Sequence, residues 1–480
     1  MSNNFNFEGL GSRPQFGIGA EDRFAETAEF YKALQAGYGT DHASLTGGAA
    51  LRLESLDPTL FTVTQTNDDF KLWQDLAKSR ATATVDEWTR KPSLGGFIGS
   101  AFNSELGAMI DRTGTYERKT AQVKYLMTKR SISVVQSMQK TTVASESQEM
   151  LNGTLELLTS VEHASFYGDG GVIPETFDGL YKAMLAEGSP SIDARGGKLD
   201  PESIMFLAGR VAGLKRFGRL THMYTSHLVQ ADLDTDLTPA MRINLDNTTG
   251  AIVRGAPVNA IRTTWGNIKV RPDPFAREWW EPYEVFETGA TSVDPSPPAS
   301  VAAAATGTDG SFDATMLGAY YWAAVSVNRK GVSTIVKSSQ VTVAATQRVD
   351  VTITRSVAAD ETGYYVYRTR LGDTNTTANF RYFKQVAVAG ATTVVADRNT
   401  EIPGTSCVFL LDLGGNRGPA AVSIRQLMPM TKFQLFPSNT AEIPWAQLLF
   451  LYLRMTLLER CAIIRNIVPS QATWKPFSLV

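Results

Sequence analysis

The chain has 480 residues, with 46 Lys and Arg against 48 Asp and Glu and a formal net charge of −2 at pH 7. Hydrophobic residues make up 43% and charged residues 20%, which is typical of a globular protein and excludes collagen-like and wholly disordered chains. The balanced charge also excludes a strongly basic nucleic-acid binder that gains its affinity by neutralising phosphates. At roughly 100–200 residues per domain, the length predicts about three units.

The cysteine content and the hydropathy of the sequence indicate the cellular compartment in which the chain is expected. The two cysteines, Cys407 and Cys461, are too few for a disulfide framework or a four-thiolate zinc site and favour a reducing compartment. Residues 1–19 lack a basic start followed by an apolar run, so we expect no signal peptide. The apolar stretch 445–468 is interrupted by charged side chains and should not span a membrane. We expect residues 448–453 to form a strand buried on both faces instead.

The N-terminal region predicts one helix preceded by an extended segment. Residues 24–38 carry apolar side chains at three- and four-residue spacing, with Glu21 and Asp22 at the start and glycines at the end. Residues 1–20 contain three phenylalanines among glycines, too few for a core. Such a segment either packs on its own domain or straps across a neighbouring subunit, and both alternatives remain open.

Residues 82–133 predict an extended hairpin. Residues 116–119 lead into an alternation of Val123, Tyr125 and Met127, and a glycine-punctuated excursion precedes them. A two-stranded ribbon is marginal in water, so this hairpin is expected to need a partner surface. The alternative is a flap folded onto its own domain.

Two helices are indicated next. A helix over residues 146–167 is predicted from an apolar row and from the glycines that follow it; the row is Leu151, Leu155, Leu158 and Val161. A second helix over about residues 201–216 is predicted from Asp200 as N-cap and Pro201 at the first helical position.

A linker and an all-β module follow. Residues 289–310 are rich in Pro, Ala and Gly, which predicts a linker. Beyond it, short alternating apolar runs separated by turn residues are typical of a sandwich; they are 321–327, 341–343, 349–353, 365–367 and 386–388. The module ends at residues 402–404. Apolar strands at 408–413 and 447–454 lack this pattern, so the chain is expected to re-enter its first domain.

The residues that carry chemistry do not form a catalytic pattern. The four histidines, His42, His163, His222 and His227, lack the spacing of a zinc site. Residues 17–19 (Gly-Ile-Gly) follow no apolar strand, which argues against a dinucleotide fingerprint. No glycine-flanked serine elbow is available to pair with a histidine. We therefore expect no enzyme activity, no catalytic, cofactor-binding or metal-binding residues, and no cofactor.

Two further candidates receive structural interpretations. Asp232, Asp234 and Asp236 resemble the opening of a calcium loop, but Leu237 and Ile243 stand where that loop needs Gly and Glu. We expect a solvated loop there. Cys407 and Cys461 lie in apolar strand contexts and are expected to be core residues rather than nucleophiles.

Three groups of motifs occur in order over residues 47–260. They are Gly47-Gly48-Ala49-Ala50-Leu51-Arg52-Leu53-Glu54-Ser55-Leu56 with Lys71-Leu72-Trp73; Tyr116-Glu117-Arg118-Lys119 with Val123-Lys124-Tyr125-Leu126 and Thr128-Lys129-Arg130; and Asn152-Gly153-Thr154 with Phe166-Tyr167-Gly168-Asp169, Phe177-Asp178-Gly179-Leu180 and Asp193-Ala194-Arg195-Gly196-Gly197. In this order and spacing they resemble the major capsid proteins of tailed double-stranded-DNA bacteriophages, which share the HK-ninety-seven-type (Johnson) fold.

The resemblance implies an α+β capsid fold in five parts. These are an N-terminal arm (1–75), an E-loop hairpin with flanking strands (76–135), peripheral and axial domains with a spine helix (136–290), an inserted β sandwich (291–406) and return strands (407–480). The insertion resembles fibronectin type III and other immunoglobulin-like domains through residues 320–325 and 363–368, although these two strands occur in the reverse of the usual order.

The resemblance also implies a function. The chain would self-assemble through hexamers and pentamers into an icosahedral head shell that encloses double-stranded DNA without sequence-specific binding and without a membrane. Residues 88–119 would contact an adjacent subunit, and scaffold, portal and decoration proteins are suggested as further partners. The location would be the virion, assembled in the host cytoplasm. The alternatives are an encapsulin-like compartment, a tail structural protein, and a secreted carbohydrate-active enzyme with a fibronectin-like module.

Overall fold

The computed structural model describes residues 67–93, 95–96, 101–109, 111–139, 145–213, 216–241, 258–276, 295–414, 420–437, 440–472 and 474–477. The chain divides into two compact units, and almost all described residues belong to the unit formed by residues 64–137 and 146–480. The predictions for residues 1–20, the helix at 24–38, His42 and the motif at 47–56 lie outside the described residues.

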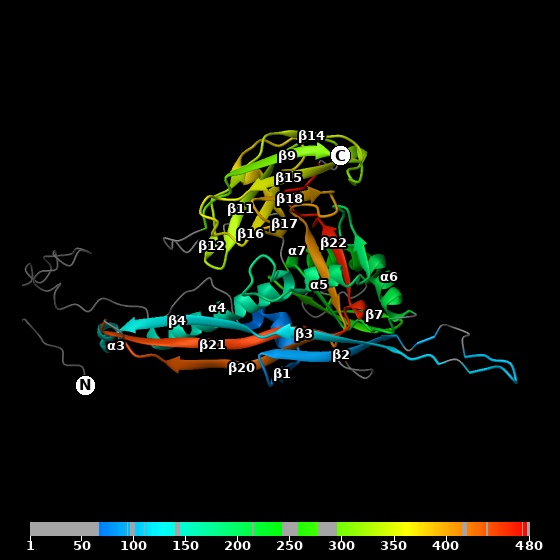
Figure 1. Cartoon of the computed structure of the whole chain (residues 1–480), viewed down its shortest axis with the longest axis horizontal. Helices are drawn as coiled ribbons and strands as arrows, with labels where there is room; N and C mark the ends of the chain where they lie inside the picture. The colour runs from blue at the N-terminus through cyan, green and yellow to red at the C-terminus, as the bar shows by residue number, and fades with distance from the viewer. Residues whose placement is uncertain are drawn as a thin grey trace, which may run out of the picture. The chain divides into compact units, whose positions relative to one another are not determined.

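A four-stranded sheet joins strands from both ends of the chain (Figure 1). Its order is β1 (Lys78–Arg80), β20 (Val422–Gln434), β21 (Glu442–Met455) and β4 (Lys124–Ser133). The outer strand β1 runs parallel to β20, whereas the β20–β21 and β21–β4 pairs are antiparallel. Helix α4 (Ser145–Tyr167) lies along one face of this sheet, where Leu157 and Val161 pack against leucines of β21.

Helix α4 confirms the predicted long helix, with one difference in its apolar row. Leu155, Leu158 and Val161 are buried as predicted, but Leu151 is 44% exposed, so the buried row begins one turn later. Gly153 marks the closest approach of helix and sheet, because a Cβ at this position would overlap Oε1 of Gln447 on β21.

A six-stranded sheet forms the second layer, in the order β5-β22-β19-β6-β8-β7. The strands are β5 (Ser191–Asp193), β6 (His222–Thr225), β7 (Ala260–Thr263), β8 (Gly266–Pro272), β19 (Ser406–Leu411) and β22 (Ala462–Ile467). Every residue of β19 is buried. Phe409 and Leu411 enter the core shared with α4, whereas Val408 and Leu410 enter the core on the opposite face. The predicted apolar strand therefore forms and is covered on both faces.

Helices cover the faces of this sheet. They are α5 (Leu180–Ala186), α6 (Pro201–Ala212) and α7 (His227–Met241). The predicted N-cap is confirmed, since the Asp200 side chain accepts a hydrogen bond from the Glu202 N–H at 3.1 Å. Helix α6 ends at Ala212, four residues before the predicted end, because Gly213 adopts an extended backbone. The short elements η5 (Asn67–Asp69), α2 (Lys71–Asp75), α3 (Val134–Met138) and η8 (Leu458–Arg460) complete this part.

Residues 295–402, here called the β module, form an all-β unit. Its five-stranded sheet has the order β12-β11-β16-β17 with β13 added on β11, the second sheet has the order β18-β15-β9, and β10 pairs with β14. The elements are β9 (Ser300–Thr306), η6 (Ala314–Met316), β10 (Gly318–Tyr320), β11 (Trp322–Asn328), β12 (Gly331–Val332), β13 (Val336–Lys337), β14 (Val341–Val343), β15 (Arg348–Thr354), β16 (Gly363–Arg368), η7 (Thr377–Asn379), β17 (Arg381–Ala387) and β18 (Thr392–Asp397).

The strands predicted in this module are confirmed. Residues of the two larger sheets share one core, in which Trp322 and Tyr364 meet Val351. Strand β11 alternates as expected, because Ala323 and Val325 face a different cluster from Trp322. The described strands therefore stack as two layers around buried side chains.

The linker prediction is wrong for its second half. Residues 300–306 form β9, which pairs antiparallel with β15 from Ser300–Thr354 to Thr306–Arg348. Alanine is weakly disposed to strands, but pairing along all seven residues and burial of Val301 override that preference. Residues 289–294 lie outside the described residues.

The β module packs against the chain on either side of it in sequence. Val172 joins the cluster formed by Ala323 and Val325, and the Gln385 side-chain amide donates to the Tyr167 carbonyl at 2.8 Å. From the C-terminal side, Phe477 enters the module core. The module is therefore seated on the rest of its unit through buried contacts rather than tethered by flexible chain.

Candidate functional site

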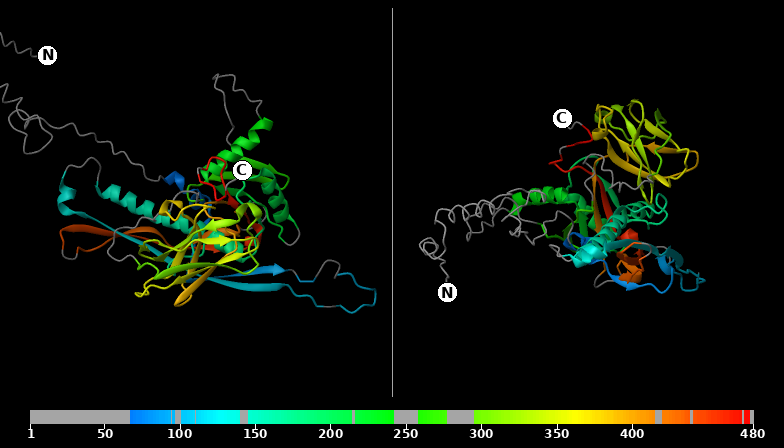
Figure 2. Two further views of the ribbon diagram at one scale, coloured as in Figure 1. Left: turned by 90° about the horizontal axis from the view of Figure 1, so that it is seen from above. Right: turned by 90° about the vertical axis from the view of Figure 1, so that its left-hand side faces the viewer.

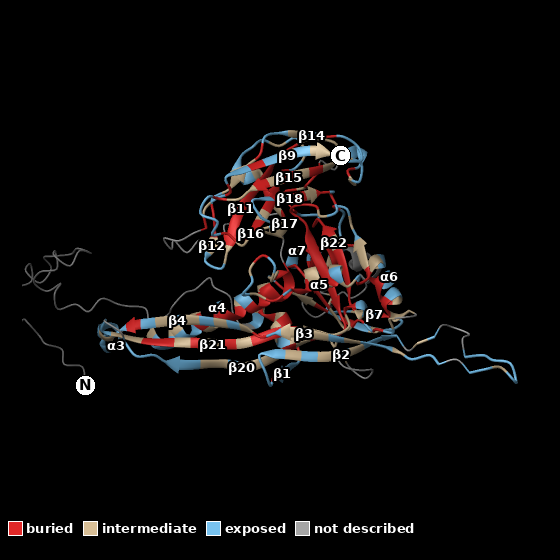
Figure 3. Cartoon of the chain, viewed as in Figure 1, coloured by how far each residue is buried: buried red, intermediate tan, exposed pale blue. Residues whose placement is uncertain are grey.

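The β2–β3 hairpin is a largely exposed element of the described chain (Figures 2 and 3). β2 (Val85–Ser93) pairs antiparallel with β3 (Thr115–Gln122), from Val85–Gln122 to Ser93–Thr115, which confirms a hairpin within residues 82–133. The prediction is wrong for Tyr125 and Met127, which lie on β4 and pair with β21 instead. Neither β2 nor β3 contains a buried residue, and both run past the neighbouring strands in two views. The hairpin therefore gains little apolar burial from the described part of its own chain.

Three large apolar side chains stand at the far end of this hairpin. Phe102, Leu106 and Met109, here called the apolar tip, are 89%, 97% and 96% exposed. The turn between them is ordered by Asn103, whose Nδ2 donates to the carbonyls of Gly107 and Ala108, each at 3.0 Å. Large apolar side chains with this degree of exposure are candidates for a contact surface. These three residues were not predicted as a contact surface, although apolar residues within a glycine-punctuated segment are a usable signal.

The base of the hairpin is fixed to the rest of the unit. The Arg90 guanidinium contacts Glu117 across the hairpin at 2.7 Å and Glu187, just after α5, at 2.9 Å. The Trp88 ring lies 5.2 Å from the guanidinium of Arg454 on β21. An anchored base and an exposed tip give the hairpin a defined direction in which to reach a partner.

A second exposed apolar surface lies on the four-stranded sheet, opposite α4. On β4, Tyr125 is 50% and Met127 is 64% exposed, and the Tyr125 ring meets the edge of Phe450 on β21 at 4.9 Å. Leu448 and Phe450 are only half-buried, so the prediction that residues 448–453 are buried on both faces is wrong at these two positions, whereas Leu449 and residues 451–453 are buried as predicted. The reason is that α4 covers one face, whereas the hairpin base covers only the end of the other.

A third apolar surface lies beside α6. Met205 and Phe206 are exposed on that helix, and Phe217 is exposed on the loop that follows it. Trp265, in the turn between β7 and β8, packs against α6, since a Cβ at Gly209 would come within 2.9 Å of its ring. These side chains extend the exposed apolar area to the six-stranded part of the unit.

A cavity of about 220 Å³ lies where α5 meets β17. Tyr167, Tyr181 and Tyr382 line it together with Cys407. Burial raises the pKa of the Cys407 thiol to about 12, so at neutral pH it is not a thiolate nucleophile. Lys182 also lines the cavity, but its ammonium group is paired with Asp169 and Asp178 at 2.6 and 2.7 Å. Neither Cys407 nor Lys182 is therefore an activated nucleophile in this cavity.

The remaining predicted candidates are dispersed. His163 lies on α4, His222 on β6 and His227 at the start of α7; burial lowers the pKa of His222. Within the described ranges, no group of three His, Cys, Asp or Glu side chains could hold a metal ion. Both cysteines are buried and unbonded, as predicted, and burial also raises the pKa of Cys461 to about 12. Among the described helices, none is both long and apolar enough to cross a bilayer.

The solvated loop predicted for the aspartate triplet is wrong. Residues 232–236 belong to helix α7. Asp232 is buried and accepts hydrogen bonds from the backbone N–H and hydroxyl of Ser470, while Asp234 accepts from the Val258 N–H at 2.8 Å. Their carboxylates fasten other segments to the helix, so these two aspartates have structural roles.

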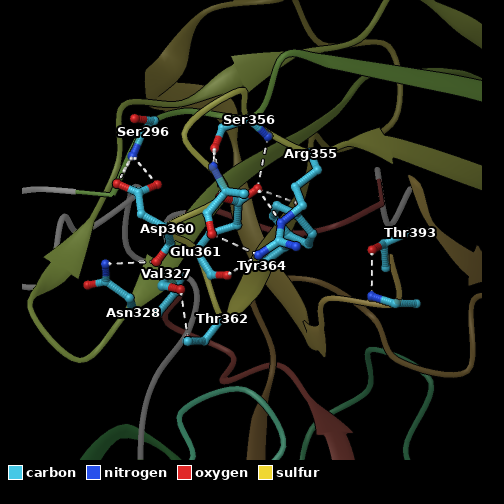
Figure 4. A network of polar contacts seen from close by, with 12 residues as sticks. Ser296, Val327, Asn328, Arg355, Ser356, Asp360, Glu361, Thr362, Tyr364 and Thr393 are labelled. Atoms are coloured by element: carbon cyan, nitrogen blue, oxygen red, sulfur yellow. Dashed lines mark hydrogen bonds and ion pairs between the residues drawn. The ribbon is translucent and has the colours of Figure 1, made fainter. Parts of the chain in front are cut away.

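A polar network in the β module also has a structural role (Figure 4). The buried Glu361 carboxylate accepts hydrogen bonds from the Ser356 N–H and hydroxyl and from the Tyr364 hydroxyl, at 2.9, 2.7 and 3.1 Å. Burial alone would raise the pKa of Glu361, but these hydrogen bonds lower it. None of the described histidines takes part, and the hydrogen bonds join residues five positions or fewer apart, so the network closes a turn.

Comparison with known proteins gives similarity to phage capsid proteins. No protein-family model matches the chain. It is 27% identical over 464 residues to the major capsid protein of Staphylococcus phage S25-3, covering 93% of this chain and 96% of that protein. It is 27% identical over 471 residues to the major capsid protein of Staphylococcus phage K, with the same coverage.

Among solved structures, the capsid of Myoviridae phage XM1 matches with a TM-score of 0.44 and 10% identity, covering 86% of this chain and 97% of that one. At this TM-score the structural match does not assign the fold. By sequence, the chain is similar over nearly its whole length to major capsid proteins of phages.

Proposed function

We propose that this chain is a major capsid protein that self-assembles into the icosahedral head shell enclosing the double-stranded DNA genome of a tailed phage. The observation that carries the proposal is the similarity to two phage major capsid proteins over more than nine-tenths of each chain. The exposed hairpin supports it independently, because large apolar side chains exposed at its tip suit a contact with another subunit.

The proposal assigns an HK-ninety-seven-type fold to the chain. Residues 1–75 are the N-terminal arm, 76–135 the E-loop hairpin with its flanking strands, 136–290 the peripheral and axial domains, and 407–480 the return strands. The packing of α4 along a four-stranded sheet supports its assignment as the spine helix. Residues 291–406 are an immunoglobulin- or fibronectin-like insertion on the outer face, where the module does not compete with packaged DNA for space.

The mechanism of assembly is geometric. One chain occupies places in both hexamers and pentamers, and the hairpin residues 88–119 reach an adjacent subunit. A closed shell repeats each contact many times, so modest pairwise free energies are sufficient for a stable particle. Scaffold, portal and decoration proteins are further partners, and the virion assembles in the host cytoplasm without a membrane.

The charge balance suits a container for DNA. A net charge of −2 provides no excess of basic side chains to neutralise phosphates, so the shell wall encloses the DNA without binding a specific sequence. Particles purified from infected cells should therefore protect DNA from nuclease, and the chain alone should show no sequence preference for DNA. Filled particles also separate a phage capsid from an encapsulin-like compartment, which would enclose protein.

Negative-stain electron microscopy of the full chain, expressed alone and with the other head proteins, tests the proposal. Closed shells are expected. Because Ser93 and Thr115 pair directly, residues 94–114 can be replaced by an Asn-Gly turn that keeps the hairpin register. This shortened chain, and a chain lacking residues 1–19, should remain folded and soluble but form no shells.

Three outcomes would contradict the proposal. Uniform monomers of the full chain under all assembly conditions would argue against a shell protein. Rods would indicate a tail protein. Normal shells from the shortened chain would show that the hairpin does not make the required subunit contact.

A further inference from the structure

Two buried carboxyl groups meet beneath the segment that leads into β1. Glu162 on α4 and Asp273, which follows β8, are both fully buried. Glu162 Oε1 accepts a hydrogen bond from the Leu72 N–H at 2.8 Å, and Glu162 Oε2 accepts from the Trp73 N–H at 3.0 Å. One carboxyl group thus holds the start of α2 on the long helix, across 90 positions of sequence for Leu72.

The second carboxyl group is only partly satisfied. Asp273 Oδ1 accepts from the Phe275 N–H at 2.8 Å, whereas Oδ2 is buried with no donor among the other described residues. Two carboxyl groups that are buried side by side cannot both be ionised without a large cost in free energy. A proton on Glu162 resolves both problems, since Glu162 then donates to Asp273 and only one negative charge is buried.

Electrostatics agree with this geometry. Burial, and next the charge of Asp273, raise the pKa of Glu162 to about 9, and burial raises the pKa of Asp273 as well. The pair as a whole therefore retains a proton at neutral pH.

Charged and titratable groups face the pair from every element packed on it. Lys78 follows α2, donates to the Trp73 carbonyl at 2.6 Å and has a pKa that burial lowers. From β6, the Tyr224 hydroxyl donates to Asp75 at 3.0 Å. The Arg271 guanidinium of β8 lies 3.4 Å from Asp75, and His227 of α7 is close enough to act on the charge of Asp273.

We propose that Glu162 and Asp273 share one proton and form a clasp that holds residues 70–76 on α4, and that loss of this proton releases the segment. On deprotonation the proton passes to hydroxide or buffer base, and two facing carboxylates remain in a dry site. The site can lower that cost only by opening to water, which breaks the hydrogen bonds to Leu72 and Trp73. The inference goes beyond shell formation and does not depend on it.

The direction of the pH dependence follows from linkage. The clasped state holds one proton that an opened, hydrated pair gives up near the ordinary pKa of a carboxyl group. The clasp is therefore fully stable at acidic pH and weakens as pH rises toward 9. Above that pH the contribution of the proton is lost. The test is made above pH 7.5, beyond the range in which unperturbed histidines titrate.

Hydrogen exchange of the full chain tests the clasp between pH 7.5 and 9. After correction for the intrinsic base-catalysed rate, protection of the Leu72 and Trp73 amides should fall by up to about tenfold per pH unit. In Glu162→Gln the side-chain carbonyl still accepts from these amides and the side-chain NH₂ donates to Asp273, so protection should stay flat. Asp273→Asn should behave similarly and provides a second variant if the first folds poorly.

Two controls make the test decisive. Glu156→Gln changes an exposed carboxylate of the same helix and should retain the pH response of the unaltered chain. Lys78→Met tests the neighbouring cation and should retain the response too. A flat pH profile in the unaltered chain, the same slope in Glu162→Gln, or loss of the slope in Lys78→Met alone would overturn the proposal.

Discussion

Strands β2 and β3 of the hairpin and strand β11 of the β module are of similar length and pair antiparallel, yet their surroundings differ. Six of the seven residues of β11 are buried, whereas no residue of β2 or β3 is. Trp322 of β11 is fully enclosed, and the apolar tip of the hairpin is almost fully exposed. Both regions have regular backbone pairing, so pairing alone does not measure how much free energy a strand gains inside its own chain.

The difference lies in what covers the side chains. Two stacked sheets bury both sets of side chains in the module, which therefore has its own core. The hairpin has backbone hydrogen bonds but little apolar burial, and its free energy must come from a surface outside the described chain. Four predictions follow the coverage of side chains from the module through the packing of α4 to the hairpin, in order of their expected effect on the free energy of unfolding.

The largest effect is expected for Asp397→Ala in the module. Asp397 Oδ2 accepts from Arg368 at 2.7 Å and from the Trp322 indole N–H at 3.0 Å, and both charged side chains are buried. Removing the carboxylate leaves a buried, uncompensated guanidinium, so we expect a loss of about 3–5 kcal/mol in denaturant unfolding. The exposed pair Arg195–Asp313 supplies the control, since Asp313→Ala should cost less than about 1 kcal/mol. Equal losses would refute the contrast.

Gly153→Ala is expected to have a smaller effect on the free energy of unfolding, with a sign that depends on the side chain at position 447. Gly153→Ala removes a helix-interior glycine, which alone is worth about 1 kcal/mol of stabilisation, but the new Cβ displaces the Gln447 side chain that donates to the Met150 carbonyl at 2.9 Å. We expect a net loss of about 1–2 kcal/mol in the unaltered background, by overpacking. In a Gln447→Ala background, the same change should stabilise the chain. Stabilisation in both backgrounds would mean that helix and sheet are not closely packed there.

Arg90→Ala should loosen the hairpin locally. The lost contacts to Glu117 and Glu187 are worth at most about 1 kcal/mol, so the unfolding midpoint should hardly move. Hydrogen exchange in β2 and β3 should rise while exchange in β21 stays constant. Arg118→Ala, which removes an exposed contact to Glu87, is the matched control and should leave both unchanged.

The smallest effect on folding is expected for the triple change Phe102→Ser, Leu106→Ser and Met109→Ser. These side chains are already in water, so the free energy of unfolding should change by less than about 0.5 kcal/mol. Assembly, followed by light scattering, should nevertheless be lost. A cooperative loss of stability in the isolated chain would mean that the tip is buried against its own subunit.

The elements that the sequence predicted well depend on local signals. Helix α4 was identified from its 3.6-residue period and terminal glycines, and helix α6 from Asp200 and Pro201 at its start. The hairpin and the module strands followed from period-two alternation between turn residues. No local signal identifies β9, because a run of alanines becomes a strand only when β15 offers a partner edge. The aspartates of α7 misled the prediction because their partners, Ser470 and Val258, are distant in sequence.

By itself, the sequence determined the length and balanced charge of the chain, the periodicities of its main elements, and the motifs and relatives from which a capsid function is inferred. The tertiary structure alone decided which apolar side chains are exposed to water and which acidic side chains are buried. Phe102 and Leu158 are both apolar, but only Leu158 has a sheet against it; Glu156 and Glu162 lie on one helix, but only Glu162 meets a second carboxyl group. Burial and proton sharing depend on distances between segments far apart in the chain, and no local pattern encodes those distances.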